Sequence, residues 1–218
     1  MLELLCQDMG GKLCASVRPY LESAAKSLDL ATDFISLEIR IDDLPDSKEP
    51  WLHLVRSGDP AEKRVLGTLF CSESCFCKKA PAVGTVFPTA EVWDQALAPK
   101  DGLPFDLNLF SESRTEKFLH HELLLARDLV RGLVVPRAIA TGQIEAFSAV
   151  WAVVIDGRLE RLGLPGYSMT ERRSSFSRLF ACAGVLLPGH WHIFQSLWDG
   201  GIADWKDALA SIRLLPTL

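Results

Sequence analysis

The sequence predicts an α+β fold, in which a small, mainly antiparallel sheet is followed by a helical C-terminal half. Between positions 34 and 71, short runs rich in β-branched, aromatic and other apolar residues alternate with turn residues, a pattern typical of strands. From position 113 onward, apolar residues recur at helical spacing between capping residues and glycines. The change near Leu109 separates residues 1–110, with one helix and the sheet, from residues 111–218, which are helical. We expect the two regions to form one compact domain.

The N-terminal region is expected to contain one helix and a three-stranded antiparallel meander. Apolar residues at helical spacing predict a helix over about 11–30, and Pro19 either kinks it or lies in its first turn. Because the gaps between the strands are short and turn-like, neighbours in sequence are expected to pair. The strands are expected over 34–41, 51–56 and 64–71, followed by a short helix over 90–97 and a strand over 105–110.

Five helices are predicted in the C-terminal region from their capping residues. Ser113 and Glu116 form a capping box, in which each side chain accepts a hydrogen bond from the backbone amide of the other residue, and Gly132 supplies a left-handed stop. Ser168 and Glu171 form a second capping box. The helices are expected over 113–131, 141–162, 168–183, 191–198 and from 204 onward.

The composition argues against several classes of protein. The formal net charge of -5 is spread along the chain, whereas a nucleic-acid partner requires a basic face. No apolar run approaches the roughly 18 residues of a membrane span, and the N-terminus lacks the basic and apolar regions of a secretory signal. We therefore expect a cytoplasmic protein whose six cysteines are reduced thiols.

Three of these cysteines, Cys71, Cys75 and Cys77, lie close together in the sequence. On a strand they would share one face, because their positions have the same parity, and could there bind a soft metal. Their spacing matches neither a zinc ribbon nor an iron–sulfur motif. Structural thiols and a surface redox pair are the alternatives.

The residues best suited to catalysis lie on the helix expected over 113–131. His121-Glu122 resembles the opening of the zinc-protease motif H-E-x-x-H, in which two histidines one turn apart bind zinc and the glutamate is the general base. Leu125 occupies the position of the second histidine. Glu145, twenty positions further on, resembles the glutamate that is the third zinc ligand in gluzincins, a group of the zincin metallopeptidases.

The resemblance covers residues 113–163 and implies a zincin-like fold, since zincin domains also place a mixed sheet before the motif helix. It implies that His121 and Glu145 are metal ligands, that Glu122 is the catalytic base, and that zinc is the metal. Antiparallel packing of the two helices would then bring His121 and Glu145 close together. Two positions depart from the family pattern: Leu125 cannot coordinate a metal, and Ala149 stands where gluzincins usually carry an acidic residue that orients a histidine.

Other side chains could complete or replace this ligand set. Asp156 or Glu160 could be a substitute ligand, or could orient His121, if either turns inward. His190 and His192 would share a face on a strand but point apart on a helix.

Three functions remain open. The first is a degenerate zincin-like metallopeptidase homologue without protease activity. The second is a non-enzymatic domain that binds a protein or peptide partner through a C-terminal half rich in tryptophan, with Trp191, Trp198 and Trp205. The third is a metal-dependent, peptidase-like hydrolase with a rearranged ligand set.

Overall fold

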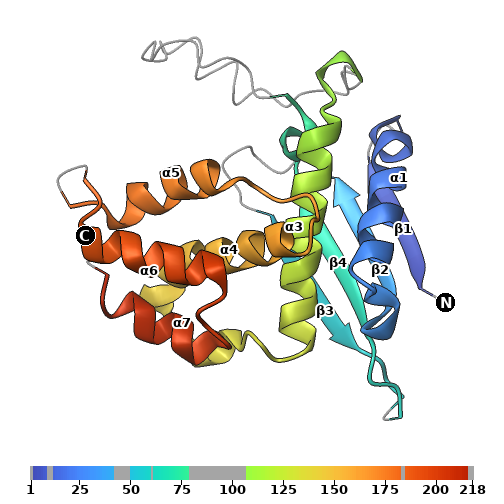
Figure 1. The fold of residues 1–218 in the computed structure, drawn as a ribbon. Coiled ribbons are helices and arrows are strands. Elements are labelled where there is room, and N and C mark those ends of the chain that lie inside the picture. The colour runs from blue at the N-terminus through green and yellow to red at the C-terminus, as the bar shows by residue number, and fades with distance from the viewer. Residues whose placement is uncertain are drawn as a thin grey trace, which may run out of the picture.

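The computed structural model describes residues 2–8, 12–41, 50–59, 61–78, 107–182 and 185–215. A four-stranded sheet precedes a helical C-terminal half (Figure 1), so the α+β class is confirmed. The predicted helix over 90–97 lies outside the described residues, and within the predicted strand over 105–110 the segment Leu107–Leu109 is a 3₁₀ turn. The strands are β1 (Glu3–Asp8), β2 (Phe34–Ile41), β3 (Trp51–Arg56) and β4 (Val65–Cys71); the α-helices are α1 (Lys12–Ser27), α3 (Glu112–Val130), α4 (Ile144–Arg161), α5 (Met169–Phe180), α6 (Pro188–Asp199) and α7 (Trp205–Ile212).

The sheet is mixed, so the prediction of a mainly antiparallel sheet is wrong. Its order is β1-β2-β4-β3; the pairs β1–β2 and β2–β4 are parallel, and β3–β4 is antiparallel. The predicted hairpin of the last two strands is present, but β2 pairs with β4 instead of with its neighbour in sequence. The unexpected strand β1 pairs with β2 in parallel, because α1 carries the chain back to the starting edge between them.

Two helices cover one side of this sheet, where α1 and α3 lie side by side (Figure 1). The Asp8 carboxylate at the end of β1 accepts hydrogen bonds from the amides of Leu13 and Cys14, so it caps the first turn of α1. The apolar face of the sheet, including Leu37 and Leu69, joins the same buried core as the inner faces of α1 and α3.

The predicted helix ends agree with the structure only in part. Helix α4 begins at Ile144, α5 ends at Phe180 and α6 begins at Pro188, each three residues from the prediction, and the N-cap of α3 also differs. Ser111, not Ser113, is its N-cap: the Ser111 hydroxyl accepts from the Arg114 amide. The Ser111 amide in turn donates to the carbonyl of Phe76, which holds residue 111 extended and fixes the helix start there. The capping box of Ser168 and Glu171 is present in α5.

Helix α4 is the centre of the helical half. It contacts α3, α5, α6 and α7, and it buries residues around most of its circumference. At Gly157 the backbones of α4 and α6 approach so closely that a Cβ atom would overlap the carbonyl of Trp198. Within the described part of the chain, none of the helices combines the length and apolar character that a membrane span requires.

Candidate functional site

His121 lies at the contact between α3 and α4, where it meets a carboxylate. Its side chain is buried, and its Nδ1 lies 3.0 Å from Oδ1 of Asp156, which has no exposed surface. Because a carboxylate accepts, the proton of a neutral His121 ring lies on Nδ1 and Nε2 keeps its lone pair. Asp156 thus fixes the tautomer and the orientation of the imidazole.

Arg172, from α5, places its guanidinium beside both of these side chains. Its Nε donates to Oδ2 of Asp156, and its Nη2 lies 3.1 Å from Nδ1 and 3.4 Å from Nε2 of His121. Since Nδ1 already carries a proton, Nε2 is the acceptor that the guanidinium can reach. Arg172 therefore places a permanent positive charge beside the lone pair of His121.

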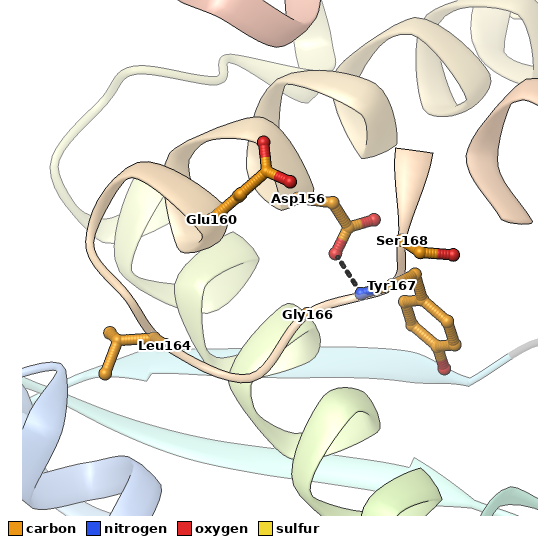
Figure 2. A pocket seen from close by; sticks show the side chains of 6 residues that line it. All are labelled: Asp156, Glu160, Leu164, Gly166, Tyr167 and Ser168. Atoms are coloured by element: carbon orange, nitrogen blue, oxygen red, sulfur yellow. Dashed lines mark hydrogen bonds between the residues drawn. The ribbon is translucent and has the colours of Figure 1, made fainter. Parts of the chain in front are cut away.

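Tyr167 closes the other side of this group. Its backbone amide donates to Oδ1 of Asp156 at 3.1 Å, as Figure 2 shows, and its ring packs edge-on against His121 with the Arg172 guanidinium 4.3 Å from the ring centre. Burial raises the pKa of Tyr167 to about 12, against the opposing charge of Arg172. We call His121, Asp156, Tyr167 and Arg172 the His121 cluster.

A small cavity of about 110 Å³ lies next to the His121 cluster. It is bounded by Asp156 and Glu160, one turn apart on α4, and by the loop that leads into α5 (Figure 2). Glu160 accepts a hydrogen bond of 2.6 Å from Nε1 of Trp198. The two carboxylates therefore have separate partners, Asp156 in the cluster and Glu160 on α6.

A second charge pair joins α3 and α4, between Asp128 near the end of α3 and Arg158, which follows Asp156 on α4. Asp128 accepts from Arg158 at 2.7 Å and from Nε1 of Trp151 at 3.1 Å. Burial raises the pKa of Asp128, although Arg158 opposes the rise. These contacts and the pair His121–Asp156 hold α4 against α3, and α4 lies across α3 instead of alongside it (Figure 1), so the expected antiparallel packing of the two helices is not observed.

The expected metal ligands do not come together. Glu145 is exposed in the first turn of α4 and precedes Asp156 by 11 positions, about 16 Å along a helix. Since His121 meets α4 at Asp156, the pairing of His121 with Glu145 is wrong. Glu145 therefore lies before the contact between α3 and His121's partner on α4, and Asp156 lies at it.

The donor set does not fit a zinc site. Catalytic zinc has three protein ligands and one open position, and no group of three or more His, Cys, Asp or Glu residues that could hold a metal is found among the described residues. Leu125 offers no donor, and the lone pairs of His121 and Asp156 already face the guanidinium of Arg172. Glu122 is half-buried on α3 beside His121, where a catalytic base would stand.

The other candidate donors are placed separately. The Cys71 thiol donates to the carbonyl of Arg40 and the Cys77 thiol to that of Glu73, so these two cysteines point to different acceptors. His190 is buried on α6 whereas His192 is exposed, and the two rings therefore point apart.

The tryptophan surface expected on the C-terminal half is only partly available. Trp198 is buried with its Nε1 bonded to Glu160, while Trp191 and Trp205 are half-buried.

Arg172 and Tyr167 are not among the site residues expected from the sequence. Neither belongs to a short motif, and both meet His121 only because α5 docks on α4. One signal is available: a carboxylate that turns inward from α4 requires a counter-charge, and an arginine follows the α5 capping box at once.

No protein-family model, curated protein or solved structure matches this chain.

Proposed function

We propose that the chain is a zincin-like metallopeptidase homologue without protease activity, in which the guanidinium of Arg172 stands where a catalytic metal ion would bind. The observation that carries the proposal is the contact of the Arg172 guanidinium with both His121 and Asp156. The order of elements supports it, because a mixed sheet precedes the helix with His121-Glu122 and a further long helix, α4, follows.

The geometry around His121 supports descent from a metal site. A histidine that binds a metal through one ring nitrogen usually donates from the other to a carboxylate. His121 has the carboxylate half of this arrangement, with Nδ1 on Asp156, and Nη2 of Arg172 lies beside the ring, 3.1 Å from Nδ1 and 3.4 Å from Nε2. Here a single delocalised positive charge takes the place of a divalent one.

The substitution removes the chemistry of a metallopeptidase. A bound metal lowers the pKa of its water and polarises the scissile carbonyl, whereas a guanidinium has no open coordination position and stays protonated. Without an activated water, Glu122 has no nucleophile to deprotonate. A protein of this kind acts by binding, and a peptide or another protein is the ligand class that the resemblance implies.

The same reasoning applies to localisation. The six cysteines are thiols in the structure, and thiols persist in a reducing compartment. We therefore propose the cytoplasm as the site of action.

Zinc titration calorimetry of the purified protein, with a peptidase assay in the presence of zinc, tests the proposal. We expect neither stoichiometric zinc binding nor hydrolysis. The variant L125H/R172A, which supplies a second imidazole and removes the guanidinium, should bind zinc more than tenfold more tightly than L125H, a difference of about 1.4 kcal/mol.

The matched control is L125H/R173A, which removes the neighbouring arginine but keeps Arg172 in place. It should bind zinc no better than L125H. One zinc per chain in the native protein, lost on H121A and accompanied by peptide hydrolysis, would overturn the proposal in favour of a hydrolase with a rearranged ligand set.

A further inference from the structure

Two cysteines outside the His121 cluster lie in contact. Cys6 is on the edge strand β1, Cys14 is in the first turn of α1, and their Sγ atoms are 2.7 Å apart. Both residues are free thiols and half-buried.

The local backbone holds this pair in place. Asp8 accepts from the amides of Leu13 and Cys14 at 2.8 and 2.9 Å, which ties the first turn of α1 to the end of β1. On the other side, Cys6 is held in register with Ile39 of β2. The contact between the sulfurs is therefore a consequence of the strand pairing and the helix cap together.

We propose that Cys6 and Cys14 are a reversible redox pair that closes into an intrachain disulfide when the protein meets a small-molecule disulfide oxidant. To form the bond, the sulfurs need to approach by only about 0.7 Å, given an S–S length of about 2.05 Å. The bond would fasten the edge strand β1 to α1 across a short connection.

The exchange balances with glutathione disulfide as the oxidant. The thiolate of one cysteine attacks a glutathione sulfur, forms a mixed disulfide and releases one glutathione thiolate. The second cysteine thiolate then attacks the protein sulfur of the mixed disulfide and releases the second glutathione. The two protein thiols lose two electrons and two protons, and the oxidant gains them as two glutathione thiols.

Access and reactivity set the conditions of the reaction. Cys6 and Cys14 are only partly buried, which leaves them more open to a small disulfide than Cys71, which is buried. Burial raises the pKa of the Cys6 and Cys14 thiols above the usual value, so only a small fraction is thiolate at neutral pH. Oxidation should therefore be slow at pH 7 and accelerate up to about tenfold per pH unit above it.

The test uses the full chain in glutathione buffers of increasing oxidised fraction, followed by alkylation and tryptic mapping without reduction. Trypsin cuts after Lys12 and Lys26 but not at Arg18, which precedes Pro19, so the disulfide would join peptide 1–12 to peptide 13–26. We expect two of the six thiols to be lost and this linked pair to appear, then to disappear on reduction.

Single variants separate the pair from the other thiols. C6S and C14S should each abolish the linked peptides, and C182S, the matched control, should oxidise like the native protein. The proposal is overturned by linkage through Cys71, Cys75 or Cys77, by glutathione that remains on Cys6 or Cys14 without ring closure, or by resistance of both thiols until the chain is unfolded.

Discussion

Replacing Arg172 by methionine tests the central contact of the His121 cluster. The substitution keeps much of the side-chain volume but removes the guanidinium, so Asp156 loses its counter-charge while it remains fully buried. Breaking a buried ion pair by removing one partner costs about 3–5 kcal/mol, because the remaining charge has no compensation. For a chain of 218 residues, a loss of this size lowers Tm by on the order of 10 °C.

Urea denaturation followed by circular dichroism measures the effect, and two variants sharpen it. R173M is the matched control, because its guanidinium is exposed and only stacks on Trp191 at 4.4 Å, a contact of about 1 kcal/mol at most. In R172M/D156N the unpaired charge is absent, and the asparagine oxygen can still accept from the Tyr167 amide. The double variant should therefore recover at least about 2 kcal/mol relative to the sum of the single effects.

One result would refute the reasoning. If R172M costs no more than R173M, and the coupling with D156N stays below about 0.5 kcal/mol, Arg172 does not neutralise Asp156. Its contact with His121 would then not be a substitute for a metal, and the proposed function would lose the observation that carries it.

Two further predictions concern the surrounding fold. Burial lowers the pKa of His120 below its usual value of about 6.5. The folded state therefore favours the neutral ring. The contribution of His120 to stability is fully present above pH 6.5 and is lost as the pH falls through the folded-state pKa. Urea melts at pH 7.5 and 5.5 should show this loss in H192Q, which changes an exposed histidine, and less of it in H120Q. G157A should cost about 3 kcal/mol, because its methyl group would overlap the Trp198 carbonyl, whereas G142A, with nothing within 4 Å, should change stability by less than about 1 kcal/mol in the same assay.

Helix ends that depend on local chemistry could be predicted from the sequence. The capping box of Ser168 and Glu171 needs only residues within one turn, and the structure contains it. The start of α3 could not be predicted in the same way, because Ser111 and Ser113 both offer a cap. The choice depends on the hydrogen bond from the Ser111 amide to the carbonyl of Phe76, which is 35 residues away.

The order of the strands in the sheet could not be predicted from the sequence of each strand alone, because it depends on pairing between distant segments. The segment β1 alternates in burial like any half-exposed strand, but its partner β2 begins after a whole helix. Strand β3, which follows β2 in the sequence, pairs only with β4 at the outer edge, so the order of the strands in the sheet differs from their order in the chain.

The candidate site was predictable in its histidine and in one of its partners, but not in the others. His121 follows from the motif pattern, and Asp156 from the expectation that an inward acidic residue on the next helix could orient it. Glu145 was favoured by family spacing, which assumes a fixed helix crossing, and the crossing here lies 11 residues further along α4. The contact of Arg172 with His121 and Asp156 could not be predicted from a local sequence pattern, since it depends on how α5 packs against α4.

The position of α4 has a consequence for how the chain unfolds. Because four helices pack against α4, detaching any one of them would expose apolar surface on α4. Detaching α5 would also remove Arg172, the counter-charge of Asp156. Local unfolding of a single helix therefore has a high free-energy cost, and the helical half should unfold as one cooperative unit. Native-state hydrogen exchange should accordingly find the amides of residues 153–159 among the slowest of the protein, released only when the whole unit opens.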